Sequence, residues 1–197
     1  MKKIILLIGI VTLIVPFTTL AQGSYISFEY VVGFPTGDLG DYISKTSFRG
    51  AVIEYQKYLK DNLSIGGEVG WSAFYERKDF DTYSQENISA SGVQYRYSSQ
   101  VPILISAEYN FRPEATFKPY ANFGLGTMYS RRDTDMGLWY VREEAWHFAL
   151  KPEVGIMCEI NLNTSFNLSA KYYTGFASGD LETQSYFALG AGFLFLF

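Results

Sequence analysis

The chain ends with the stretch Phe187-Ala188-Leu189-Gly190-Ala191-Gly192-Phe193-Leu194-Phe195-Leu196-Phe197. Its odd positions carry phenylalanine or leucine, with alanine at one place, and its even positions begin with small residues. Successive side chains of a β-strand point to opposite faces of a sheet, so this alternation predicts a strand with one strongly apolar face. The stretch is also about as long as a tilted strand that crosses a bilayer.

The same period-two pattern recurs seven times upstream. The predicted strands are residues 25–34, 48–59, 63–75, 95–111, 119–131, 146–160, 165–176 and 185–197. Short turns follow the second, fourth and sixth strands, at 60–62, 112–116 and 161–164. Longer polar segments follow the others, at 35–47, 76–94, 132–145 and 177–184. This asymmetry predicts an all-β fold, an eight-stranded antiparallel up-and-down transmembrane β-barrel with short periplasmic turns and long extracellular loops.

The two faces of the predicted strands differ in residue type. One face is apolar, as at Val101, Ile103 and Ile105, and the other is small or polar, as at Ser64 and Glu68. A soluble barrel also alternates, with its apolar face inside. The polar face here carries Gly66, Gly70, Gly124, Gly126, Gly155, Gly175, Gly190 and Gly192. Small residues suit a narrow lumen better than a solvated surface, so the apolar face is predicted to contact lipid.

Two prolines fall inside predicted strands, Pro102 and Pro152. Proline lacks the backbone N–H that a ladder needs, so a bulge or a local break is expected at each.

The first residues have the features of a secretory signal peptide. Two lysines at positions 2 and 3 precede an uncharged run over residues 4–15, and a small-residue pattern ends at Ala21. Pro16 interrupts the run, which is short for a membrane span of about 20 residues. We therefore predict a cleaved signal peptide at 1–21, one barrel domain at 22–197, and export to the cell outer membrane.

Composition excludes several other classes. Cleavage would remove two of the 16 basic residues and leave 14 against 20 acidic ones, so the formal net charge would change from -4 to -6. Such an acidic chain gives no indication of nucleic-acid binding. The single cysteine, Cys158, lies in an apolar alternation and is predicted to pack rather than to react. Mean hydropathy is zero, as expected where only alternate residues face lipid.

The last stretch resembles the C-terminal assembly signal of bacterial outer-membrane proteins. The matching residues are Gly192, Phe193, Phe195 and Phe197, whereas Leu194 and Leu196 depart from a polar lumen face. The mature chain resembles the family of small bacterial outer-membrane β-barrel proteins that includes OmpX-like and OmpW-like members. The resemblance implies the fold and the location. We also expect a monomer that contacts outer-membrane lipid, and the barrel assembly machinery through its last strand. The resemblance implies no activity.

Charged residues fall on the predicted lumen face. They are Glu29, Glu54, Glu68, Glu108, Lys151, Glu153 and Lys171. An eight-stranded barrel is just wide enough for side chains to fill it, and unpaired charges there are costly. We predict an ion-pair network centred on Lys171, which reaches Glu68 or Glu54. A hydrated cavity lined by the same groups is the alternative, because the carboxylates outnumber the cations.

No catalytic residue, metal site or cofactor is predicted. Some small outer-membrane barrels modify lipid A with a histidine, a serine and an acid. His147 is the only histidine, its parity places it on the lumen face, and no serine-centred motif accompanies it. Paired aspartates in the long connections lack the spacing of a calcium loop.

Basic residues gather near the predicted outer boundary. The candidate lipopolysaccharide contacts are Arg49, Arg77, Lys78, Arg131 and Arg132, with Arg96 and Arg142 nearby. Guanidinium groups suit phosphates, although ordinary solubility explains the same distribution.

The sequence thus favours a non-enzymatic outer-membrane barrel of structural or surface-interaction type with a side-chain-filled lumen. A narrow transporter of small hydrophobic molecules is the alternative, followed by a lipid A-modifying enzyme.

Overall fold

The computed structural model describes residues 23–85, 88–137, 139–179 and 181–197. The predicted signal peptide, residues 1–21, lies outside the described residues. The elements in chain order are β1 (Ser24–Thr36), α2 (Gly37–Tyr42), β2 (Ser47–Lys60), β3 (Leu63–Gln85), β4 (Ile88–Asn110), β5 (Phe117–Asp135), β6 (Tyr140–Asn161), β7 (Thr164–Gly175) and β8 (Gln184–Leu196). Among these residues, no helix has the length and apolar character needed to cross a membrane.

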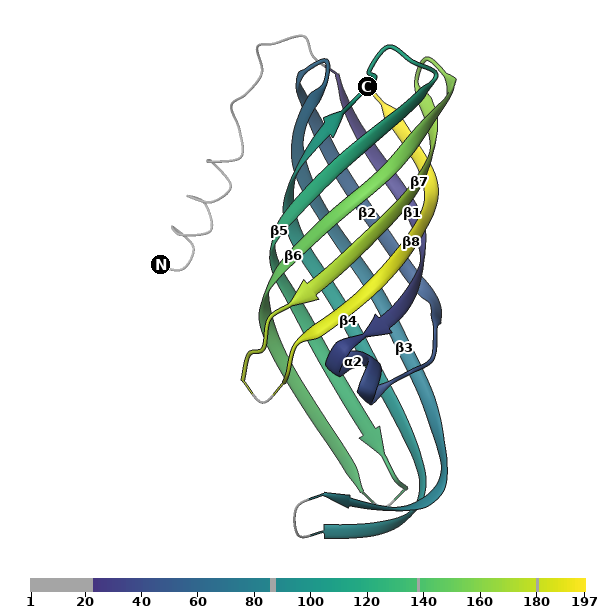
Figure 1. Ribbon diagram of the computed structural model, residues 1–197, viewed down its shortest axis with the longest axis vertical. Coiled ribbons are helices and arrows are strands. Elements are labelled where there is room, and N and C mark those ends of the chain that lie inside the picture. The colour runs from purple at the N-terminus through teal and green to yellow at the C-terminus, as the bar shows by residue number, and fades with distance from the viewer. Residues whose placement is uncertain (1–22, 86–87, 138, 180) are drawn as a thin grey trace, which may run out of the picture.

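The strands close into one antiparallel barrel (Figure 1). Each strand pairs with the next along the chain, and β1 pairs with β8 from Tyr25 opposite Leu196 to Thr36 opposite Ser185. The C-terminus lies at the same end as the short turns. This strand order confirms the predicted eight-stranded up-and-down barrel. Its neighbouring strands are antiparallel, as connections by short turns require.

The predicted facing of the strands also agrees with the structure. Outward residues such as Ile105 and Val154 are 65% and 60% exposed, whereas inward Gln56 and Ser64 are fully buried. Large apolar residues on the outside and buried polar residues on the inside reverse the arrangement of a soluble protein. This reversal is what a barrel surrounded by lipid requires.

The strands extend further outward than the sequence predicts. Residues 76–94 were expected to form a loop, but β3 and β4 continue pairing out to Gln85 opposite Ile88. Likewise β5 and β6 pair out to Asp135 opposite Tyr140. Beyond the bilayer a strand needs no apolar face, so the hydropathy alternation that marks strands is lost although the backbone ladder continues.

The expected local breaks occur at both prolines. The β3–β4 ladder skips from Val69 to Ser72, opposite the segment that contains Pro102, and the β6–β7 ladder skips from Leu150 to Glu153. Pairing resumes in the same register each time, so each proline interrupts the hydrogen bonds without turning any side chain to the other face.

The lumen is filled in three layers. Near the turn end, Tyr25, Tyr120, Met157 and Leu194 form an apolar cluster. The charged residues lie in the middle layer. A second apolar cluster towards the outer end includes Val31, Val52, Leu39, Ile43, Phe74, Leu104, Met128, Ala149, Tyr173, Tyr186 and Ala188.

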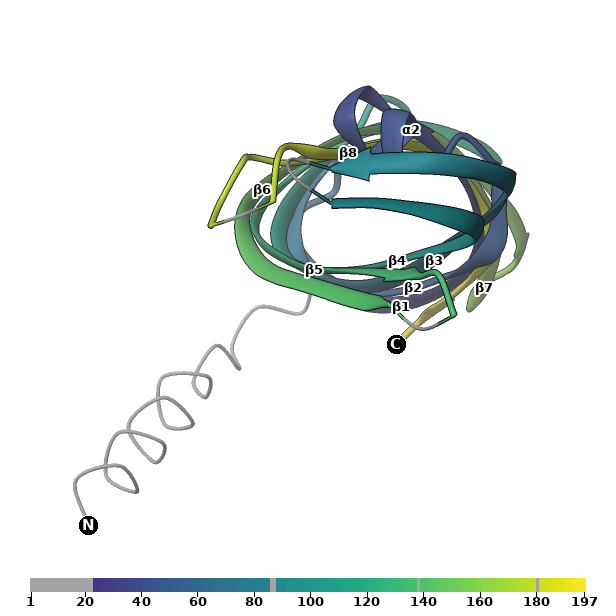
Figure 2. The same cartoon turned by 90° about the horizontal axis from the view of Figure 1, so that it is seen from below.

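Helix α2 and the segment after it complete the outer layer. The helix packs against β8 and β1 at the outer rim (Figure 2). The Tyr42 hydroxyl lies 2.7 Å from the Thr134 hydroxyl on β5, and the Ser44 amide donates to Glu76 on β3. Because β5 lies across the barrel from β1, this segment bridges the outer end of the lumen.

Candidate functional site

The middle of the lumen holds an ion-pair network. Lys171 Nζ lies 3.1 Å from Glu29 Oε1 and 3.6 Å from both Glu68 Oε2 and Glu153 Oε1. Lys151 Nζ lies 2.5 Å from Glu68 Oε2 and 2.6 Å from Glu153 Oε2. All five side chains are essentially buried. Two ammonium groups therefore share Glu68 and Glu153, and the network has two centres rather than the single centre at Lys171 that the sequence suggested.

Neutral donors complete the coordination of these carboxylates. Glu68 accepts from the Tyr173 hydroxyl, Glu153 from the Tyr120 hydroxyl at 2.8 Å, and Glu29 from Ser169 at 2.6 Å. These donors were not among the predicted lumen residues, although their positions in the alternating strands place them on the lumen face. Buried charges are tolerated only when their remaining hydrogen-bond capacity is met, so the donors belong to the network.

Two predicted members have no lysine partner within ion-pair distance among the described residues. Glu54 Oε1 instead accepts hydrogen bonds from Gln56, Ser106 and Asn122. Glu108 accepts from the Tyr25 hydroxyl at 2.7 Å and from Asn110. Of the two partners predicted for Lys171, Glu68 lies within ion-pair distance, at 3.6 Å, and Glu54 does not. Lys171 also pairs with Glu29 on β1, because β7 and β1 both flank β8.

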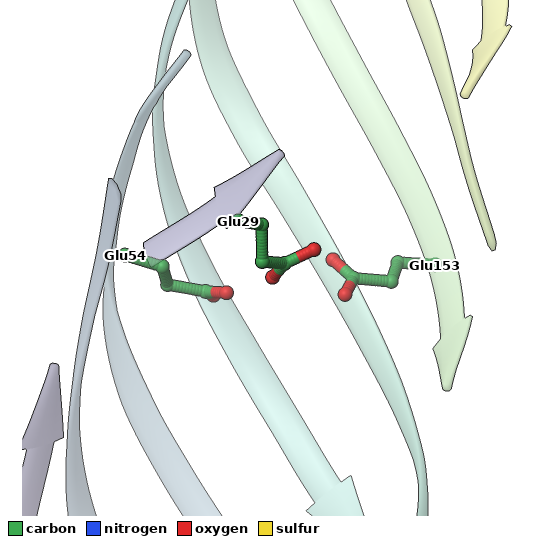
Figure 3. Close-up of side chains that lie close together, drawn as sticks. All are labelled: Glu29, Glu54 and Glu153. Carbon is green, nitrogen blue, oxygen red and sulfur yellow. The ribbon is translucent and has the colours of Figure 1, made fainter. Parts of the chain in front are cut away.

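Three lumen carboxylates converge closely enough to resemble a metal site. Single oxygens of Glu29, Glu54 and Glu153 all lie within 4.8 Å of one another, and the side chains point together (Figure 3). The Lys171 ammonium already lies within 3.6 Å of two of them. An ammonium group at that place would repel a divalent cation, so we assign Glu29 and Glu153 to the ion-pair network and not to a metal site.

His147 faces the lumen and is 1% exposed. Its Nδ1 lies 2.7 Å from the Phe176 carbonyl, where β6 passes the end of β7. The ring is thus fixed inside the wall, on the opposite face from the lipid.

The predicted basic contacts divide between the two faces of the wall. Arg49 and Arg77 are exposed on the outside, and Arg131 is partly exposed there. The prediction is wrong for Arg132, which is 8% exposed and inward, with Nε 3.2 Å from Gln184 Oε1. Its even position on β5 is the reason, because even positions of that strand face the lumen. Lys78 pairs with Glu76 at 2.9 Å.

The inward arginines hold the bridging segment. The guanidinium carbons of Arg96 and Arg132 lie 5.0 Å and 4.7 Å from the centre of the Tyr42 ring. Both distances allow cation–π attraction, so these two arginines contact Tyr42 and not a lipid.

On the outer face of the wall, the Asp133 carboxylate forms ion pairs with two arginines. Asp133 lies beyond Tyr129 and Trp146, towards the outer end of β5, and meets Arg131 Nη2 at 3.1 Å and Arg142 Nε at 2.8 Å. Burial alone would raise the pKa of Asp133, but hydrogen bonds from Arg142 and Tyr140 and the charge of Arg131 hold the pKa below its ordinary value. Asp133 is therefore an anion that fixes both arginines.

The C-terminal strand closes the barrel. Phe193, Phe195 and Phe197 point outward and are substantially exposed. A Cβ atom on Gly192 would lie 2.0 Å from the Phe28 carbonyl oxygen on β1. Only glycine fits there, so this residue has a steric role in the closing seam as well as a place in the predicted signal.

The comparisons with known proteins agree with this architecture. The sequence matches the family described as outer membrane protein beta-barrel domain over residues 5–195. No curated protein matches it.

Solved structures of similar fold include three outer-membrane barrels. Neisserial surface protein A is 17% identical, with 87% of this chain and 96% of that chain covered and a TM-score of 0.59. Ail of Yersinia pestis is 13% identical, with 90% and 100% covered and a TM-score of 0.57. OprG of Pseudomonas aeruginosa is 14% identical, with 90% and 96% covered and a TM-score of 0.55. At these identities the likeness shows the fold, and the family match indicates the outer membrane as the location. The chain belongs to the outer membrane protein beta-barrel domain family.

Proposed function

We propose that this protein is a non-conducting outer-membrane barrel of structural or surface-interaction type, whose activity resides in its outer surface. The observation that carries the proposal is the lumen, which packed side chains and a buried ion-pair network fill at three levels. A path for solutes would need a continuous cavity, and charges held this tightly cannot move aside without losing their partners.

The outer surface offers a platform for such interactions. Pairing of β2 with β3 ends at Ser72, and pairing of β6 with β7 ends at Ala149. Beyond these points β3, β4, β5 and β6 continue as a four-stranded sheet that projects from the barrel (Figure 1). A sheet that projects beyond the barrel presents side chains away from the membrane, which suits a surface role.

Conductance tests the filled lumen directly. In planar bilayers we expect the wild-type protein to give no steady channel. As a control, Phe74→Ala with Tyr186→Ala removes two rings of the outer layer, whose centroids lie 5.4 Å apart, and should not conduct either, because the ion-pair network and the turn-end cluster remain. Steady conductance or uptake of small hydrophobic solutes by the wild type would favour the transporter instead.

A non-enzymatic role also predicts the behaviour of His147. We expect His147→Ala to leave the lipid A composition of the host membrane unchanged, because the ring is buried on the lumen side. Loss of its contact with the Phe176 carbonyl should reduce stability by about 1 kcal/mol, and the cavity left by the buried ring should add to that loss. Altered lipid A at a normal protein level, measured by mass spectrometry, would instead reveal an enzyme.

A further inference from the structure

A row of outward positions crosses four strands near the outer end of the barrel. The pairing of β2 with β3 ends at Gly50 opposite Ser72, and Arg49, the next residue of β2, lines the same hollow as Ala73. Ala73 pairs with Ser99, and Ser99 pairs with Arg131. The row therefore places two small residues between two arginines. At about 4.8 Å per strand, the backbones of the arginines are about 14 Å apart.

The small residues leave a hollow in the outer wall. Its volume is about 310 Å³, and both arginines line it. This volume lies at the lower end of the range for small-ligand sites, about 300–1,000 Å³. Such a hollow can take a headgroup rather than a single ion.

Aromatic side chains wall the hollow on both sides. Tyr75 and Tyr97 lie on the side nearer the outer end of the barrel, with ring centroids 5.0 Å apart. Trp71 and Tyr129 lie on the side nearer the turn end, and Trp71 Nε1 donates to the Ser99 hydroxyl at 3.1 Å. Tryptophan and tyrosine gather where the apolar and polar zones of a membrane meet, so the hollow lies at the level of lipid headgroups.

The charge at the hollow favours an anion. Arg49 is exposed, and the Arg131 side chain is 42% exposed. Asp133 also lines the hollow, but its carboxylate is shared between Arg131 and Arg142. Among the residues that line the hollow, two cations therefore meet one anion, and Arg131 is held in place by its contact with Asp133.

We propose that this hollow binds the phosphorylated headgroup of an outer-leaflet glycolipid, of the lipopolysaccharide type, with Arg49 and Arg131 on its phosphate oxygens. Guanidinium groups donate parallel hydrogen bonds to phosphate, and the aromatic walls provide flat surfaces for the sugar ring. A membrane lipid is the source because the site faces outward among aromatic residues of the wall, where a soluble phosphate would have to displace lipid. The inference goes beyond the proposed function, since it depends neither on the lumen nor on the projecting sheet.

Binding of bis-phosphorylated lipid A by the purified protein in detergent micelles tests the site. We expect Arg49→Gln with Arg131→Gln to weaken binding at least about tenfold. Ser99→Leu, which keeps both arginines and fills the hollow, should weaken it severalfold. Lipid A stripped of its phosphates should bind wild type and the double variant equally. Heat-modifiable gel migration confirms that each variant is a folded barrel.

The matched control removes two positive charges at the opposite end of the barrel. Lys60→Gln with Arg112→Gln, both at exposed periplasmic turns, should bind lipid A like the wild type. Equal weakening in this control would show non-specific attraction and overturn the site, as would unchanged binding by the Arg49/Arg131 variant. Displacement of lipid A by an equal concentration of soluble pyrophosphate would overturn the assignment to a lipid. None of these outcomes bears on conductance, so the two proposals fail separately.

Discussion

Replacing Lys171 by methionine is expected to lower the free energy of unfolding by about 3–5 kcal/mol, because it leaves buried carboxylates without their counter-charge. Among the described residues, Glu29 has its only ion pair with Lys171, at 3.1 Å. Methionine has a similar length and fills similar space, so the loss is electrostatic rather than steric. The urea midpoint of the heat-modifiable folded form, measured in detergent, reports the change.

Two further variants separate the network from general effects of lost charge. Lys118→Met removes a partly exposed lysine that pairs with Glu159 at 3.0 Å, and it should cost only about 0–1 kcal/mol. Adding Glu29→Gln to Lys171→Met should restore much of the lost stability, because the unpaired charge is then gone. An unfolding midpoint that Lys171→Met leaves unchanged would mean that water already solvates these groups, and the hydrated cavity would replace the network.

Substituting valine for Gly192 is expected to prevent closure of the barrel. The new Cβ would meet the Phe28 carbonyl oxygen at 2.0 Å and the Glu29 Cα at 2.7 Å. Both are backbone atoms of β1, so the contact cannot be relieved by a rotamer change, and β8 cannot hold its register with β1. We expect the folded, heat-modifiable band to be absent and the protein to be nearly lost from the outer membrane.

Refolding in detergent distinguishes this steric role from recognition by the assembly machinery. If the glycine serves closure, Gly192→Val fails to fold in detergent as well as in cells. Ala191→Val adds the same side chain one position away, on the outward face, and should fold in both. Normal refolding of Gly192→Val in detergent, combined with failure in cells, would assign the residue to recognition alone.

Much of the fold could be predicted because the alternation of apolar and polar residues along each barrel strand is a local pattern. Period-two alternation identified all eight strands, and the same parity placed Glu29, Glu68, Lys151 and Lys171 on the lumen face. Parity also identified His147 as inward, and it would have excluded Arg132 from the lipid contacts had it been applied at the outer end of β5. Prolines marked both ladder breaks, because the missing N–H is a property of the residue itself.

Contacts across the lumen and between neighbouring strands could not be predicted in the same way. Lys151 meets Glu68 from a strand on the other side of the barrel, and the distance between them depends on strand tilt and stagger. The outer hollow depends on register too, because Ala73, Ser99 and Arg131 are unrelated in sequence until two strand pairings align them.

The sequence by itself determined the class of this protein: eight strands, their facing, the closing aromatic strand, and a charged lumen. Each follows from alternation, a property that a strand shows without its neighbours. The tertiary structure alone decided which charges pair, why Gly192 is a glycine, and where the outer wall is hollow. These depend on the stagger between strands, and a shift of one residue in any pairing would change every partner.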